Sequence, residues 1–308
     1  MSDRRPPESL GGEEGRRLPY SKGLMAKTLS GTGLRPERAY ELARLIEQEL
    51  VREHEEHTFT EAHLNELVAR VLAEHEGEDA VRGLRRYRVL QELDLPLILL
   101  IGGATGTGKS TVTTEVAHRL GITRVASTDF VRQTMRAFFS VDFMPSIHYS
   151  SFEAAAAVAT PDEAKDPTLV GFNDQTRNVL VGVRAVIGRA LTERYSMALE
   201  GVHVVPGLVP AAVEGAVVVQ ALLAIEDEDE HARHFWVRDT GSEGLRPVAK
   251  YLDSLGDIRR IQAYLIERAE KVGVPVIENT RVERTSEAVI RLVLEQVERA
   301  VGTPTISA

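Results

Sequence analysis

Short apolar runs alternate with longer amphipathic segments from residue 95 to the end of the chain. The runs are apolar at most positions, which is typical of parallel strands that helices cover on both faces. Amphipathic segments long enough for helices fit between them. The pattern predicts an α/β fold with a five-stranded parallel sheet flanked by helices. The expected strands are 95–101, 124–127, 196–200, 217–225 and 275–278.

The region before this alternation, residues 18–93, has the apolar periodicity of helices. Pro36 stands where a helix is expected to begin, because proline is favoured at the first helical position. Thr58 and Glu61 form a capping-box pattern that predicts the start of a second helix. A third helix is expected over 78–93. These features predict a small, mostly helical module.

Composition sets the domain limits and excludes several function classes. Residues 1–17 have almost no apolar content and are expected to be a disordered tail, and the α/β domain is expected over 94–308. The formal net charge of −9 disfavours a nucleic-acid partner, which usually selects a basic surface. The absence of cysteine excludes disulfides, thiolate metal sites and cysteine nucleophiles. No apolar run reaches the length of a membrane span, and the N-terminus is polar, so a cytoplasmic protein without a membrane partner is expected.

A glycine-rich loop follows the first predicted strand and precedes a helix-like segment. Its strand–loop–helix context and its spacing are typical of a phosphate-binding P-loop, and a chance match in a simple turn is the weaker alternative. Glycines let the backbone wrap a polyphosphate and direct its N–H groups inward. Lys109 is expected to contact the outer phosphates of ATP, and the Ser110 hydroxyl to bind Mg²⁺. The residues expected to bind the nucleotide here are Gly103, Thr105, Gly106, Thr107, Gly108, Lys109, Ser110 and Thr111.

An acid and two arginines follow the second predicted strand. Asp129, Arg132 and Arg136 share one face if a helix begins there. Ligands bind beyond the carboxyl ends of strands in open α/β sheets, so Asp129 is a candidate to orient or deprotonate an acceptor hydroxyl. The arginines suit a carboxylate or a phosphate of the acceptor. The alternative is that Asp129 caps the helix and pairs with Arg132 on the surface.

The third predicted strand ends in another acid, Glu200. P-loop enzymes often hold Mg²⁺ through water with an acid at this place, although aspartate is commoner there. Glu200 is therefore the second expected metal residue, beside Ser110. His203 follows three residues later and is a candidate for substrate binding, with a structural role as the equal alternative.

Three further segments carry weaker signals. Residues 140–178 form a long, partly polar connection, and such connections are often functional. An acidic run after the fourth strand leads into a helix with basic groups at His231, Arg233, His234 and Arg238, which could close over ATP as a lid. An ordinary amphipathic surface helix is the alternative. Asn279 follows the last strand, at a position near the adenine in many P-loop kinases.

Taken in order, these motifs resemble the 2-phosphoglycerate kinases over about residues 95–295. The glycine loop is general to P-loop proteins, whereas the Glu-Gly-Val-His and His-x-Ser-Ser segments are more specific. The N-terminal module is similar to the ATP-cone module that precedes the kinase in that family. The motifs are the glycine loop within 101–111, Ser127-Thr128-Asp129-x-x-Arg132, His148-x-Ser150-Ser151-Phe152, Gly171-Phe172-x-x-Gln175, Glu200-Gly201-Val202-His203-x-x-Pro206-Gly207 and Asp229-Glu230-His231-x-x-His234-Phe235.

The resemblance implies ATP-dependent phosphorylation of the 3-hydroxyl of 2-phosphoglycerate, giving 2,3-bisphosphoglycerate and ADP. Lys109, Asp129, Arg233 and Arg238 are the expected catalytic residues. An acceptor with a phosphate and a carboxylate needs several cations, and 140–178 is the expected acceptor-binding insertion. The expected acceptor contacts are Asp129, Arg132, Arg136, His148, Ser150, Ser151, Gln175, Arg177 and His203.

Two other functions stay open at this stage, since a fold does not determine its substrate. One is a kinase for a different small molecule. The other is a regulatory protein that senses ATP without catalysis, which the helical module favours and the Asp129 segment disfavours. The oligomeric state, a homo-oligomer included, is likewise open.

Overall fold

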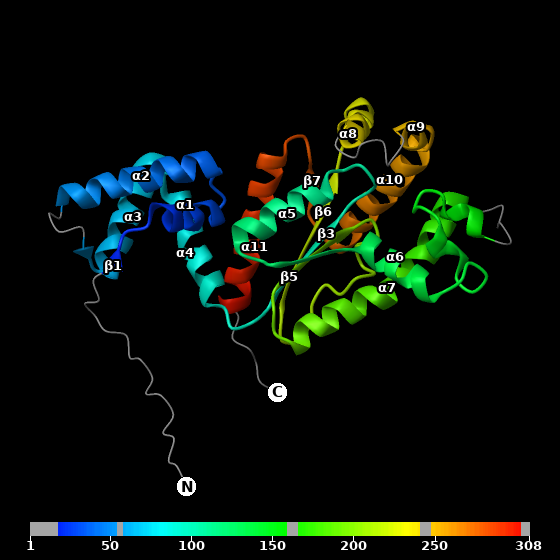
Figure 1. The fold of residues 1–308 in the computed structure, drawn as a ribbon, viewed down its shortest axis with the longest axis horizontal. Coiled ribbons are helices and arrows are strands. Elements are labelled where there is room, and N and C mark those ends of the chain that lie inside the picture. Colours follow the sequence, from blue (N-terminus) through cyan, green and yellow to red (C-terminus); the bar gives the residue numbers. More distant parts are fainter. Residues whose placement is uncertain (1–17, 54–57, 159–165, 241–247, 303–308) are drawn as a thin grey trace, which may run out of the picture. The chain divides into compact units, whose positions relative to one another are not determined.

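The computed structural model describes residues 18–53, 58–158, 166–240 and 248–302 (Figure 1). The chain forms two compact units that divide between Arg88 and Val89. The predicted tail, residues 1–17, lies outside the described residues.

The first unit is mostly helical, with one small antiparallel pair of strands, β1 and β2. Pro36 begins α2 as predicted, whereas Thr60 rather than Thr58 caps α3, because the Thr60 hydroxyl accepts the His63 N–H. The helices bury a common core of aliphatic side chains, among them Leu42 and Leu72. The elements are β1 (Leu18–Pro19), α1 (Lys22–Gly31), α2 (Pro36–Glu53), β2 (Thr58–Phe59), α3 (Glu61–Glu76) and α4 (Glu78–Glu92), which continues across the division.

The second unit contains the predicted five-stranded sheet, and all of its strand pairs are parallel. The order across the sheet is β4-β5-β3-β6-β7. The strand that leads into the glycine loop, β3, is therefore central, and all six of its residues are buried. The strands are β3 (Leu97–Gly102), β4 (Arg124–Ser127), β5 (Met197–Gly201), β6 (Val217–Ala224) and β7 (Val276–Glu278).

Helices cover both faces of this sheet, as predicted. Alternate residues of β3, Ile98 and Leu100, pack with α6 and α7 on one face, where α10 also lies against α7 and β6. Contacts of α5 with α11 and β5, and of α11 with β6, cover the other face. The helices are α5 (Lys109–Leu120), α6 (Thr128–Phe138), α7 (Pro167–Thr192), α8 (Glu228–Thr240), α9 (Val248–Asp253), α10 (Leu255–Val272) and α11 (Val282–Gly302), with two short 3₁₀ turns, η1 (Pro145–His148) and η2 (Ala154–Ala157).

The strand register brings the candidate residues to one edge. Glu200 pairs with Ile101 on one side and with Ser127 on the other. All three strands end there, so the glycine loop, Glu200 and the start of α6 share the carboxyl edge of the sheet, where open α/β folds bind ligands. In the part of the chain that the structure describes, no helix is long and apolar enough to cross a membrane.

Candidate active site

The glycine loop leads from β3 directly into α5, whose first residue is Lys109. Gly108 precedes the helix with φ +76°, a left-handed conformation that glycine adopts without strain. The Lys109 side chain is buried and lies back along the loop, with Nζ 2.6 Å from the Ala104 carbonyl oxygen. A helix N-terminus and an ammonium group therefore meet within the loop, a combination that suits phosphate.

Asn279 comes from the other end of the domain and also contacts the loop. It follows β7, is 2% exposed, and donates its side-chain amide to the Thr107 carbonyl at 2.9 Å. Its own amide oxygen accepts the Thr285 hydroxyl at 2.7 Å. The structure thus places Asn279 against the loop backbone with its polar atoms engaged.

Ser110 and Glu200 lie side by side at the carboxyl edge. The Ser110 hydroxyl donates to a Glu200 carboxylate oxygen at 2.9 Å, and Glu200 is only 8% exposed. A hydroxyl and a carboxylate are oxygen ligands of the kind that Mg²⁺ prefers, so this pair fits that ion. Among the described residues, no cluster of three or more His, Cys, Asp or Glu side chains could hold a metal by itself.

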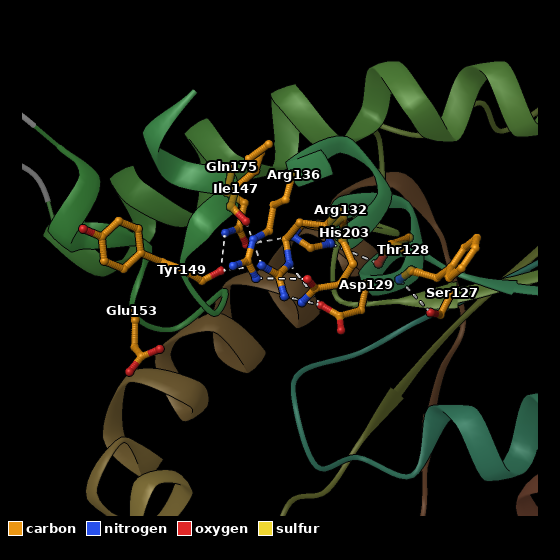
Figure 2. A network of polar contacts seen from close by, with 12 residues as sticks. Ser127, Thr128, Asp129, Arg132, Arg136, Ile147, Tyr149, Glu153, Gln175 and His203 are labelled. Carbon is orange, nitrogen blue, oxygen red and sulfur yellow. Dashed lines mark hydrogen bonds and ion pairs between the residues drawn. The ribbon is translucent and has the colours of Figure 1, made fainter. Parts of the chain in front are cut away.

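Asp129 and Arg132 form an ion pair in the first turns of α6, and Figure 2 shows it within a wider polar network. The Arg132 guanidinium donates twice to one Asp129 oxygen, at 2.7 and 3.0 Å. The Asp129 side chain is 59% exposed and that of Arg132 only 7%. The carboxylate therefore faces the open edge, while the arginine behind it fixes its orientation. The helix cap is Ser127, whose hydroxyl accepts the Phe130 N–H.

Arg132 also organises the segment after α6. The same guanidinium donates to the carbonyls of Ile147 and Tyr149, at 2.7 and 2.9 Å. The buried Gln175 amide of α7 donates to the carbonyls of Ser146 and Tyr149, at 2.5 and 3.0 Å (Figure 2). Two buried side chains, one from α6 and one from α7, thus hold the backbone of η1 and of Tyr149 against these helices. Both were expected to contact the acceptor, and in the structure their donors are engaged with protein oxygens.

His203 completes this network from the segment after β5. It is 1% exposed, and its Nε2 lies 2.9 Å from the Gln175 amide oxygen. Because that oxygen only accepts, Nε2 carries the proton, and Nδ1 accepts the Thr128 hydroxyl at 3.0 Å. Burial is the main cause that lowers the pKa of His203 to about 3, with Arg132 adding to it. The ring is therefore neutral and joins β5, α6 and α7.

The remaining predicted acceptor residues are less closely grouped. Arg136 is exposed one turn after Arg132 and bonds the Gln133 amide oxygen at 3.0 Å. His148 lies 3.0 Å from the Phe139 carbonyl through Nε2. Ser150 is half-buried and Ser151 buried, in the turn that follows η1, whereas Arg177 is exposed on α7.

The predicted lid segment is helix α8. Arg233 is 65% exposed and pairs with Glu230 of its own helix, so it does not reach the glycine loop in this structure. The side chain of Arg238 lies outside the described part of α8. Of the four basic groups expected there, His231 and His234 contact the loop and bond the carbonyls of Thr105 and Gly106 at 2.8 and 3.0 Å.

Three contacts of the site were not predicted from the sequence. Thr128 bonds His203, and Asn178 of α7 donates to the Ser146 hydroxyl at 3.0 Å. Lys250 of α9 pairs with Glu153 at 2.7 Å and ties the insertion to α9. Thr128 stands inside the Ser-Thr-Asp motif, which was its one sequence signal. Asn178 lies one helical turn from Asp174, a spacing that any polar helix face shares.

Acidification is expected to destabilise the second unit. His203 and His231 have pKa values lowered from 6.5 to about 3 and about 4, chiefly by burial. The unfolded chain therefore binds protons first as the pH falls below the ordinary histidine pKa, and stability present at neutral pH is lost. Each group contributes at most about 1.4 kcal/mol per pH unit to the free energy of unfolding. Denaturant unfolding from about pH 8 to about pH 5 measures this slope.

His203→Gln is expected to remove one of these two contributions and flatten the slope. The exposed His118 of α5 provides the matched control, because His118→Gln should leave the slope unchanged. Equal slopes for the parent and His203→Gln below pH ~6.5 would contradict a buried neutral ring.

The chain is similar in sequence to several known kinases. The 2-phosphoglycerate kinase of Methanopyrus kandleri is 35% identical over 274 residues, covering 89% of this chain and 83% of that protein. The 2-phosphoglycerate kinase of Methanothermobacter thermautotrophicus is 38% identical over 275 residues, 89% of each chain. No protein-family profile matches. A solved shikimate kinase from Acinetobacter baumannii, in complex with shikimate, is 16% identical with a TM-score of 0.37 over 67% of this chain and 97% of that one, which is too loose a superposition to carry an argument.

Proposed function

This chain belongs to the 2-phosphoglycerate kinase family, and we propose that it transfers the terminal phosphoryl group of ATP to 2-phosphoglycerate. The acceptor has a single free hydroxyl, at carbon 3, so transfer to it gives 2,3-bisphosphoglycerate and ADP. The observation that carries the proposal is the strand register, which brings the glycine loop, Glu200 and the start of α6 to one sheet edge.

The loop side of this edge binds the nucleotide. Lys109 neutralises charge on the outer phosphates, and the loop N–H groups and the α5 N-terminus hold their oxygens. Ser110 and Glu200 would hold Mg²⁺, which would screen the phosphate charge that otherwise repels an attacking oxygen. The 2.9 Å contact between Ser110 and Glu200 supports this pairing.

The α6 side binds the acceptor. Asp129 accepts the proton of the 3-hydroxyl while that oxygen forms a bond to the γ-phosphorus and the bond from phosphorus to the ADP oxygen breaks. Arg132 holds the Asp129 carboxylate and the carbonyls of Ile147 and Tyr149, so its part is to shape the acceptor site. Exposed Arg136 supplies positive charge toward the acceptor's phosphate or carboxylate.

The direct test is ADP release from ATP and Mg²⁺ by the purified full chain, with and without 2-phosphoglycerate. We expect strong stimulation by 2-phosphoglycerate, formation of a bisphosphorylated product, and little stimulation by 3-phosphoglycerate, whose free hydroxyl lies at carbon 2. Tight ATP binding without stimulation by 2-phosphoglycerate would contradict the proposed acceptor.

A further inference from the structure

Three consecutive carbonyls of the glycine loop are each held by a side-chain N–H from outside the loop. The Thr105 carbonyl accepts His231 Nε2 at 2.8 Å, and the Gly106 carbonyl accepts His234 Nδ1 at 3.0 Å. The Thr107 carbonyl accepts the Asn279 amide at 2.9 Å. The donors come from two separate elements, the first turns of α8 and the end of β7.

Holding a carbonyl also determines the direction of the next N–H. In a trans peptide unit the C=O and the following N–H point in opposite directions, and no described peptide bond is cis. The carbonyls of Thr105 and Gly106 point at α8, so the N–H groups of Gly106 and Thr107 point away from it. In keeping with this, the Thr107 N–H donates to the Ala104 carbonyl, with 3.4 Å between nitrogen and oxygen, and Lys109 Nζ contacts the same oxygen. The histidines therefore direct loop amides toward the side where the lysine ammonium lies.

The surroundings of His231 indicate that a histidine stands at this position because its Nε2–H bonds the Thr105 carbonyl. The ring is fully buried and stacks on Phe235 at 5.5 Å, which itself stacks on Tyr251 at 5.1 Å. Its Nδ1 is buried with no hydrogen-bond partner among the described atoms. A purely apolar side chain would pack there without the cost of that orphaned nitrogen. The Nε2 bond to Thr105 offsets that cost and at the same time fixes the direction of the loop carbonyl.

The glycine loop and α8 approach each other too closely for a larger residue at position 106. Gly106 has φ +88°, and a Cβ there would lie 2.6 Å from the Phe235 ring and 3.0 Å from His231 Nε2. Glycine is therefore required for the close approach of α8 to the loop. The approach places both imidazoles within bonding distance of the backbone.

We propose that His231 and His234 are positioning residues for ATP, which hold two loop carbonyls outward so that the following N–H groups face the nucleotide phosphates. The inference rests on the proposed function in one respect, namely that the loop binds ATP. It assigns the first two turns of α8 to the nucleotide site. It leaves phosphate contact to the loop amides and Lys109.

The test uses the different ring nitrogens of the two histidines. Gln places an amide nitrogen near the position of a histidine Nε2, and Asn places one near Nδ1. His231→Gln and His234→Asn are therefore expected to bind ATP like the parent. His231→Leu and His234→Leu, and the mismatched His231→Asn and His234→Gln, are expected to bind about tenfold more weakly, the worth of one lost hydrogen bond. The dissociation constant for ATP is measured by titration of the full chain without acceptor.

Two further measurements separate positioning from general damage. The KM for 2-phosphoglycerate should stay within about twofold in the weakened variants, because they leave the acceptor side intact. The control Val183→Ala, in the α7 core, should lower the thermal midpoint and leave the ATP dissociation constant unchanged. Parent-like ATP binding by both leucine variants, or equal weakening by the matched and mismatched amides, would overturn the inference. A parent chain that binds no ATP would overturn the proposed function with it.

Discussion

Replacing Lys109 by methionine is expected to lower kcat/KM for ATP by at least about 10³-fold while the fold is kept. Lys109 is the one side-chain cation that the structure shows lying along the described glycine loop, and its Nζ sits 2.6 Å from the Ala104 carbonyl. Methionine preserves the unbranched stem that packs beside Gly103 but removes the charge that we propose stabilises the transferring phosphoryl group. Steady-state ADP release measures the loss, and thermal unfolding checks the fold.

Lys271→Met is the matched control for this variant. Lys271 is exposed on α10 and pairs with Glu267, so the same change there should leave both activity and stability nearly unaltered. Turnover by Lys109→Met within about tenfold of the parent would remove the loop lysine from the mechanism and with it the central part of the proposal.

Asp129→Asn is expected to lower kcat by about 10² to 10⁴-fold with much smaller changes in the KM for ATP. An asparagine oxygen can still accept from Arg132, so the ion-pair geometry is largely kept while the capacity to take the hydroxyl proton is lost. The exposed position of the carboxylate, 59% for its side chain, leaves it open to an acceptor. Acceptor-dependent ADP release and the two KM values measure the effect.

The control for Asp129 is Asp142→Asn, which removes a carboxylate from an exposed site in the segment that follows α6. We expect parent-like kinetics for it. An Asp129→Asn enzyme with unchanged kcat, or one that loses only ATP affinity, would show that another group receives the proton.

The five strands could be predicted because a parallel strand buried on both faces leaves a signal in its own residues. The strand over 124–127 is found as expected, and the other four begin or end within two residues of the predicted limits. The glycine loop could be predicted for the same reason, because the strand before it, the loop itself and the helix after it are contiguous in the sequence. The error at α3 was also local: Thr58 and Thr60 both offer a capping hydroxyl, and the chain uses the nearer one.

The ion pair of Arg132 with Asp129 was one of two predicted alternatives, but the backbone partners of Arg132 could not be predicted. Its position after β4 suggested an acceptor ligand, and its charge is equally suited to bonding protein carbonyls. Only the folded insertion brings the carbonyls of Ile147 and Tyr149 to the guanidinium, with Asp129 on its other edge. Backbone oxygens carry no sequence signal, because every residue has one.

The sequence by itself determined the α/β architecture, the glycine loop that leads into Lys109 and Ser110, and the placing of Asp129 just past one strand and Glu200 at the end of another, because each depends on residues that are neighbours in the chain. Only the tertiary structure decided which donors hold the loop. Asn279 and His231 lie 172 and 126 residues from the carbonyls they bond. Contacts over such separations depend on strand order and helix packing, which bring together groups whose local patterns are equally consistent with a turn or a surface helix.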